Sequence, residues 1–182
     1  LVFAINQSVF AKNEKSIELK EIGRYATGVF DEGATEIVAY DRFTQRLFSV
    51  NSFNATIDIL DLSDPTNPTF IEAIDVTPFG KQANSVAVKR GIVAAAVEAD
   101  PAQDPGSVVF FDAFGNFLNS VQVGALPDML TFTPNGRYVL VANEGEPNDE
   151  YTDDPEGSVS VVDLRRGVRR ATVRTADFQK FN

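Results

Sequence analysis

Three short segments carry the pattern that decides the fold: Ile57-Asp58-Ile59-Leu60-Asp61, Val108-Val109-Phe110-Phe111-Asp112 and Val159-Ser160-Val161-Val162-Asp163. Each is a mostly apolar run that ends in an aspartate, and the three aspartates are spaced by 51 residues. Two of the runs follow the same Gly-Ser pair, at 106–107 and at 157–158. Self-similarity at a fixed period of this length is typical of repeat architectures.

The sequence on both sides of these runs repeats as well. After each aspartate come turn-forming residues and a further apolar run, at 70–76, 117–123 and 168–173. Before each run stand two more strand-like segments, at 36–40 and 46–51, at 85–88 and 92–97, and at 129–132 and 138–142. Each unit therefore holds four short strands, which is the content of one β-propeller blade.

This pattern predicts an all-β fold, a partial β-propeller over residues 1–182 with about three to four four-stranded blades. The blades are expected at approximately 33–80, 81–126 and 127–176, and residues 15–26 are expected to form a strand of a closing blade. A β-sandwich and a β-solenoid are the alternatives, but neither usually repeats four strands at this period.

Both ends of the sequence look like cuts within a longer one, and propellers usually need four or more blades to close. We expect a ring of seven or eight blades. The remaining blades would lie on further sequence or on another chain.

Composition excludes several classes of function. The formal net charge is −10, which disfavours binding to nucleic acid and to anionic membrane surfaces. The chain has no Cys and no His, so no thiolate metal site, His-based zinc site or Ser-His-Asp triad can form within it. The longest apolar stretch, 91–97, is far short of a membrane span. No organic cofactor is expected.

The most unusual segment is the loop at 144–157, which holds seven carboxylates and no Lys or Arg. Carboxylate, amide and carbonyl oxygens are the ligands of Ca²⁺, and a bound cation would relieve the repulsion among the acids. The loop does not match the EF-hand pattern. A solvated acidic loop without a ligand is the alternative. The candidate metal ligands here are Glu144, Glu146, Asn148, Asp149, Asp153, Asp154 and Glu156.

The preceding unit has a shorter relative of this loop at 98–107. Its first acid, Glu98, aligns with Glu144 and is included among the candidate metal ligands. The corresponding loop of the first unit, 51–55, carries no acid. One rim of the propeller is therefore expected to become more acidic along the chain.

Two other groups of charged residues, the strand-end aspartates and a cluster of arginines, are interpreted as structural and not as functional. The strand-end residues Asp61, Asp112 and Asp163 recur once per unit, whereas a catalytic residue is needed only once, so we expect each to start a turn. Five arginines at 165–174 alternate with apolar residues and are expected on a solvent-facing outer strand. A contact with an acidic neighbour or an anionic glycan is the alternative for the arginines.

The stretch from Thr133 to Asn182 resembles a known family. Its Pro-Asn-Gly-Arg and Val-Ala-Asn segments followed by a later Val-Val-Asp resemble YVTN-type propeller repeats. With the inserted acidic loop and the ending Thr-Ala-Asp-Phe, the stretch looks like the choice-of-anchor I family, which includes bacterial surface proteins and mesenchyme-specific cell-surface glycoproteins. The resemblance implies an exported protein, extracellular, on the cell surface or periplasmic, and it transfers no catalytic residue.

Three functions follow as hypotheses. The first is a non-catalytic surface or matrix module that binds divalent cations, or a protein or glycan partner, through its acidic rim. The second is a metal-dependent alkaline phosphatase or phosphoesterase, a label that some relatives carry, in which the acidic loop would hold Ca²⁺. The third is a structural subunit of an extracellular assembly.

Overall fold

A computed structural model describes residues 17–181 of the chain. Its twelve strands form three antiparallel four-stranded sheets, and within each sheet the strand order follows the sequence. Sheet 1 contains β1 (Val38–Asp41), β2 (Arg46–Asn51), β3 (Thr56–Asp61) and β4 (Thr69–Asp75). Sheet 2 contains β5 (Gln82–Lys89), β6 (Ile92–Glu98), β7 (Pro105–Asp112) and β8 (Phe117–Ala125). Sheet 3 contains β9 (Pro127–Phe132), β10 (Tyr138–Asn143), β11 (Ser158–Asp163) and β12 (Thr172–Ala176).

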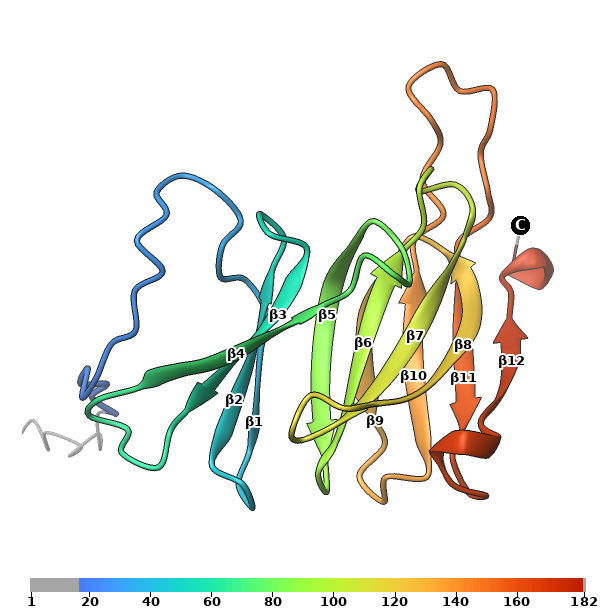
Figure 1. Ribbon diagram of the computed structural model, residues 1–182. Coiled ribbons are helices and arrows are strands. Elements are labelled where there is room, and N and C mark those ends of the chain that lie inside the picture. Colours follow the sequence, from blue (N-terminus) through green and yellow to red (C-terminus); the bar gives the residue numbers. More distant parts are fainter. Residues whose placement is uncertain (1–16, 182) are drawn as a thin grey trace, which may run out of the picture.

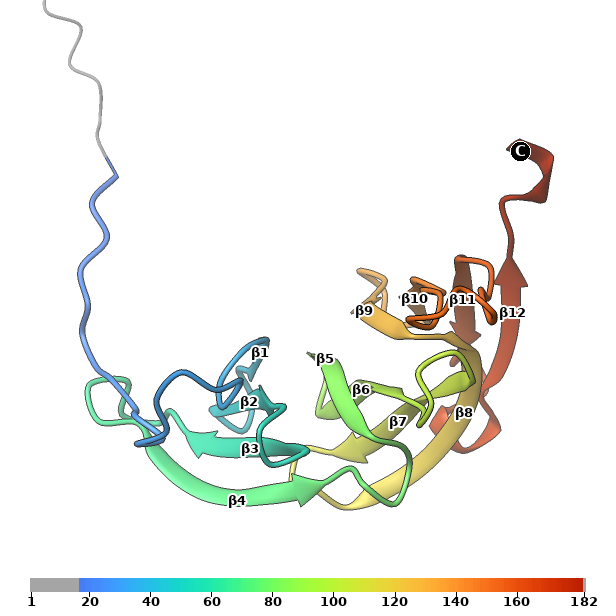
Figure 2. The same cartoon turned by 90° about the horizontal axis from the view of Figure 1, so that it is seen from above.

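The three sheets stand side by side along an arc (Figure 1). Seen from above, the first strand of each sheet lies on the concave side of the arc, and the fourth strand lies on the outside (Figure 2). This is the blade arrangement of a propeller, so the predicted all-β partial propeller is confirmed. The total number of blades stays a prediction.

The core consists of two apolar layers, one between each pair of neighbouring sheets. Strand β6 contributes to both layers, because successive side chains of a strand point to opposite faces. Val93, Ala95 and Val97 face sheet 1, Ala94 and Ala96 face sheet 3, and all five are 0% exposed. Burial on both faces explains why this strand reads as a continuous apolar run.

The last predicted strand differs from the structure. Residues 168–173 were expected to be one apolar strand, but Val168–Arg170 form a short 3₁₀ helix, η1, and β12 starts only at Thr172. Gly167 precedes η1 with a φ of 87°, a conformation that glycine adopts without strain. The carbonyl of Val168 accepts a hydrogen bond of 2.8 Å from the side chain of Asn119 in sheet 2, so η1 serves as a contact between sheets. A second 3₁₀ helix, Gln179–Phe181, follows β12.

The predicted strand at 15–26 is not formed in its described part, 17–26. A strand is defined by hydrogen bonds to a neighbour, and this segment has no neighbouring strand among residues 17–181. Instead, Ile22 and Tyr25 line a hollow of about 370 Å³ together with Leu47 and Leu60 on the outer face of sheet 1. The assignment of 15–26 to a closing blade stays a prediction, and residues 15 and 16 lie outside the described part.

No helix in the described part of the chain is long and apolar enough to cross a membrane.

Candidate functional site: the acidic loop and its surroundings

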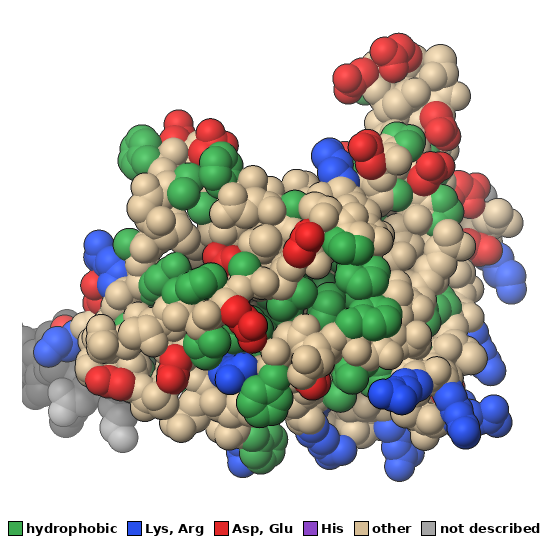
Figure 3. All heavy atoms as spheres, in the orientation of Figure 1, with side chains coloured by type: hydrophobic (Ala, Val, Ile, Leu, Met, Phe, Trp, Pro, Cys, Tyr) green, Lys and Arg blue, Asp and Glu red, His purple; other side chains and the backbone are tan. Residues whose placement is uncertain are grey.

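The acidic loop, residues 144–157, joins β10 to β11 and projects beyond the end of sheet 3 (Figure 1). Acidic side chains gather on this projection, whereas basic side chains gather at the opposite end of the same sheet (Figure 3). The two ends of sheet 3 therefore carry charges of opposite sign.

The base of the loop is fixed by the connection between β8 and β9. The backbone N–H of Glu144 donates to the carbonyl of Leu126 at 2.9 Å, and that of Gly145 donates to the carbonyl of Ala125 at 3.3 Å. Gly145 has a φ of 65°, and a Cβ there would lie 2.5 Å from the carbonyl oxygen of Pro155. The two arms of the loop approach each other so closely that only glycine fits at this position.

The tip of the loop is organised by Asn148. Its Oδ1 accepts hydrogen bonds from the backbone N–H of Thr152 at 2.8 Å and of Asp153 at 3.2 Å. Its Nδ2 donates to the hydroxyl of Thr152 at 2.9 Å. Asparagine commonly closes turns in this way. The amide oxygen that was predicted as a metal ligand is thus already used to hold the turn.

The structure does not bring the predicted ligands together. Among residues 17–181 no group of three or more acidic side chains lies close enough to hold a metal ion. Glu156 accepts a hydrogen bond of 3.3 Å from Gln179, and the carbonyl of Glu146 accepts one of 3.2 Å from Gln103 in the neighbouring β6–β7 loop. As placed, these residues do not form a ligand set for Ca²⁺, and a calcium site stays a prediction. The loop side chains it concerns are those of Glu144, Glu146, Asn148, Asp149, Asp153, Asp154 and Glu156.

Glu98, the remaining predicted ligand, lies in a different environment. It ends strand β6 and is only 4% exposed. One carboxylate oxygen is 3.1 Å from the ammonium of Lys81, and the other accepts a hydrogen bond of 3.0 Å from the side chain of Asn84. A buried carboxylate needs such partners, because taking an unpaired charge out of water is costly. Both carboxylate oxygens of Glu98 are therefore already paired with residues of the same repeat.

Glu144 has acidic neighbours instead. Its side chain is largely exposed, yet its pKa is raised above the usual value. The causes are partial removal from water and the negative charges of Asp128 and Glu146. Unbalanced negative charge at this end of sheet 3 would attract cations.

Lys81, Asn84 and Asp128 were not identified from the sequence, although they decide how the two glutamates differ. A signal was present in the repeat. Asn84 and Asp128 occupy the same position in their units, as do Lys81 and Ala125. Comparing residues 81–84 with residues 125–128 shows a cation and an amide in the earlier unit only.

The strand-end aspartates start turns, as predicted. In each sheet the carboxylate accepts the backbone N–H two residues further on, at 2.7 Å for Asp61, 2.8 Å for Asp112 and 2.9 Å for Asp163. Hydrogen bonds to the ionised form lower the pKa of Asp61 and Asp163. At Asp112 burial raises the pKa, but the hydrogen bonds outweigh it and the net shift is also downward. These contacts are local and architectural.

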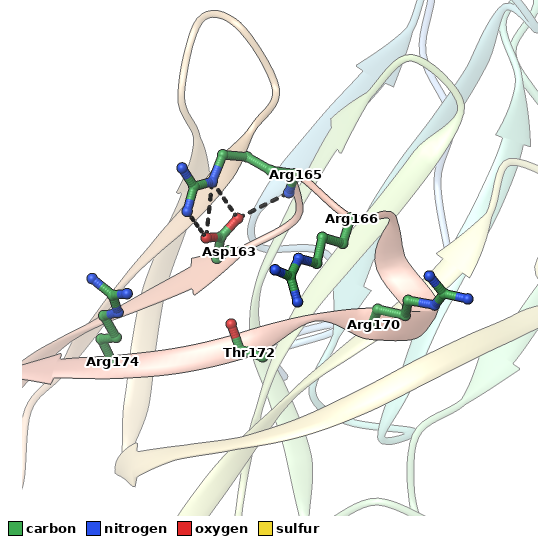
Figure 4. Close-up of a pocket in the computed structure, with 6 residues that line it drawn as sticks. All are labelled: Asp163, Arg165, Arg166, Arg170, Thr172 and Arg174. Atoms are coloured by element: carbon green, nitrogen blue, oxygen red, sulfur yellow. Dashed lines mark hydrogen bonds and ion pairs between the residues drawn. The ribbon is translucent and has the colours of Figure 1, made fainter.

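The basic end of sheet 3 is a hollow of about 460 Å³. We call this hollow the arginine corner, and it is lined by Asp163, Arg165, Arg166, Arg170, Thr172 and Arg174 (Figure 4). Arg165 holds Asp163 through two nitrogens, with a shortest distance of 2.6 Å, and its guanidinium lies over the ring of Tyr138. Hydrogen bonds from Arg165 lower the pKa of Asp163 to about 2. Arg166, Arg170 and Arg174 take part in no ion pair among the described residues.

Comparison with solved structures agrees with this architecture. The chain superimposes on a eukaryotic initiation factor with a TM-score of 0.52 and 15% identity, covering 80% of this chain and 32% of the other. It superimposes on the WD40 domain of coronin from Toxoplasma gondii with a TM-score of 0.51 and 10% identity, covering 78% and 33%. Hydrazine synthase from Kuenenia stuttgartiensis gives a TM-score of 0.42 at 13% identity, covering 79% and 54%. The chain thus spans between about a third and about half of these structures.

At such identities the likeness concerns the fold alone, and it places the chain among the β-propellers. No protein of curated function matches the chain. The model of the choice-of-anchor I domain matches residues 36–182. The chain therefore belongs to the choice-of-anchor I domain family, which confirms the resemblance found in its sequence.

Proposed function

We propose that the chain is part of a secreted or cell-surface β-propeller that binds divalent cations or a positively charged partner through the acidic loop. Its membership of the choice-of-anchor I family supports the location. One observation carries the binding role. The loop projects from the sheets with seven carboxylates, and none of them forms an ion pair with a residue of the described chain.

Electrostatics then sets the kind of binding to expect. Because the carboxylates do not converge on one point, a cation would be attracted by the summed field of the loop and not enclosed by a fixed ligand set. Such attraction is screened over roughly 8 Å at physiological salt, so it should weaken strongly as salt is added. An affinity on the order of 10⁻³ M for Ca²⁺ is typical of weak extracellular sites.

The test compares two charge-matched variants of the chain. Asp149→Asn, Asp153→Asn and Asp154→Asn together neutralise three loop carboxylates. Glu18→Gln, Asp31→Asn and Glu32→Gln neutralise three exposed carboxylates elsewhere. Isothermal titration with CaCl₂, and separately with a poly-lysine peptide, should show an affinity lower by on the order of tenfold for the loop variant only.

An equal loss of affinity in both variants would mean that the net charge of the chain alone attracts cations. The loop would then not be a binding site. The same samples should be assayed with a phosphate monoester, with and without chelator. Turnover that stops on chelation would overturn the proposal in favour of a metal-dependent phosphoesterase.

A further inference from the structure

Two of the contacts between neighbouring sheets involve the same turn of the repeat, and the third sheet shows where a further contact of this kind would lie. Between sheets 1 and 2, Arg46 donates to the carbonyl of Ala113 at 3.0 Å, and its guanidinium lies 4.5 Å from the ring centre of Phe114. Ala113 and Phe114 belong to the turn between β7 and β8. This turn of sheet 2 therefore docks on sheet 1.

The second interface uses the equivalent turn. Asn119 of sheet 2 donates to the carbonyl of Val168 at 2.8 Å, and Val168 lies in the turn between β11 and β12. In both cases, the turn between the third and fourth strands of one sheet packs on a corner of the preceding sheet. Asn119 lies on the fourth strand of sheet 2. In sheet 1 the donor Arg46 lies on the second strand, but Gly115 of the docked turn approaches the fourth strand, where a Cβ on it would lie 3.4 Å from Ile74.

The arginine corner is the equivalent corner of sheet 3. Arg174 pairs with Val161 in the register of β11 and β12, as Asn119 pairs with Phe110 and Glu72 with Ile59. Each of these partners stands two residues before the strand-end aspartate. Ile59 packs in the layer towards sheet 2, and Phe110 packs in the layer towards sheet 3. Arg174 therefore faces the side of sheet 3 on which a following sheet would stand.

The chemistry of this corner differs from that of the other two. At the inner interfaces, the docked turn offers backbone carbonyls to one arginine or one asparagine. At the arginine corner, Arg166, Arg170 and Arg174 form no ion pair among the described residues, and the carboxylate in the lining, Asp163, is already paired with Arg165. Covering three guanidinium groups with carbonyls alone would leave their charge uncompensated, which is costly. An occupant that fits has to bring negative charge.

We infer that the arginine corner receives the turn between the third and fourth strands of another four-stranded sheet, and that this turn carries carboxylates. Planar guanidinium groups bind carboxylates through two parallel hydrogen bonds, which gives the contact its direction as well as its strength. Asp163 does not contact the docked turn, because Arg165 already binds both of its carboxylate oxygens.

The test uses two short synthetic β-hairpins that differ only in the turn, Asp-Pro-Asp-Gly in one and Asn-Pro-Asn-Gly in the other. Each is titrated into the chain while the arginine Nε–Hε signals are followed by NMR. The acidic hairpin should bind on the order of tenfold more tightly than the amide hairpin and should shift the signals of Arg166, Arg170 and Arg174. Replacing Arg166 and Arg174 by Gln should abolish the preference.

Replacing Arg42 and Arg90 by Gln provides the control, because these arginines line a separate hollow shared by sheets 1 and 2. Equal binding of the two hairpins would overturn the inference. So would displacement of the acidic hairpin by an equimolar amount of inorganic sulfate, since the corner would then be a general oxyanion site. A dimer of the chain that depends on Arg174, detected by sedimentation, would also overturn it, because a second copy would then be the occupant.

Discussion

Glu98 and Glu144 occupy the same position in successive repeats, and the structure gives them opposite surroundings. Glu98 is the last residue of the second strand of its unit, and Glu144 directly follows the second strand of the next unit. Glu98 is buried between Lys81 and Asn84 at the rim of sheet 2. Glu144 is exposed at the rim of sheet 3, and the charges of Asp128 and Glu146 act on it. Glu98 therefore joins residues within its rim, whereas Glu144 is exposed to water at the equivalent position.

The difference lies in two neighbouring positions. Lys81, just before the first strand of sheet 2, corresponds to Ala125, just before the first strand of sheet 3. Asn84 in the first strand of sheet 2 corresponds to Asp128 in the first strand of sheet 3. The exchange replaces a cation by a methyl group and an amide donor by a carboxylate. The rim of sheet 2 is also covered by the first strand of sheet 3, since Asn84 donates to the carbonyl of Pro127 at 3.3 Å. Charges at a rim that a neighbouring sheet covers are removed from water and have to be paired. A rim that faces water can carry unpaired charge.

The largest expected effect on this contrast comes from Gly106, the second residue of β7, and is compared with Gly157, which directly precedes β11. A Cβ on Gly106 would lie 2.5 Å from the ring of Pro127 and 2.6 Å from the carbonyl oxygen of Val97. We expect Gly106→Ala to destabilise the chain by about 3 kcal/mol in urea unfolding, because it forces sheets 2 and 3 apart.

Gly157→Ala is the matched control. A Cβ on Gly157 would lie 2.9 Å from the carbonyl oxygen of Glu144, and its next contact would be 3.5 Å away. Since no sheet in the described chain covers this rim, the loop arms can shift, and a loss of about 1 kcal/mol is expected. Equal losses for the two substitutions would show that coverage of the rim by a neighbouring sheet is not what distinguishes the repeats.

Asn84→Asp gives sheet 2 the residue that sheet 3 has at this position. The new carboxylate would replace an amide that donates to Glu98 at 3.0 Å, so two acids would share one buried site beside Lys81. We expect a loss of about 2 kcal/mol at pH 7, in urea unfolding, from the lost hydrogen bonds and the repulsion. An equal loss for Asn84→Leu, which brings no charge, would mean that the lost hydrogen bonds and not the repulsion cause it.

The sequence predicted the repeat, the four strands per unit and the position of the acidic loop, because these depend on local patterns of apolar residues and turn formers. It assigned Glu98 and Glu144 to one metal-binding rim, since the two residues align. Their separation depends on partners that lie on a neighbouring strand, and a local pattern does not show such partners. The start of β12 at Thr172 was missed for a similar reason, because Val168 packs against Asn119 of another sheet.

The smallest expected effect comes from Asp128→Asn, which gives sheet 3 the amide of sheet 2. Ionised Glu144 weakens the folded state, because its pKa is raised on folding. Stability should therefore fall as pH rises through that pKa, and it should recover when the carboxyl binds a proton. Removing the charge of Asp128 should move the pKa of Glu144 back down and flatten this dependence, with a gain of less than about 0.5 kcal/mol at pH 7 since the group is exposed.

Carboxyl chemical shifts followed by NMR from pH 2 to pH 7 would measure this change. Asp163, at the opposite end of sheet 3, is the internal reference, because its pKa of about 2 depends on Arg165 and should not move. Its contribution has the opposite sign, since a lowered pKa stabilises the folded chain above the unfolded value and is lost as pH falls towards 2. If the pKa of Glu144 stayed raised in the Asp128→Asn variant, removal from water would be its cause. The contrast between the two rims would then rest on packing and not on their charges.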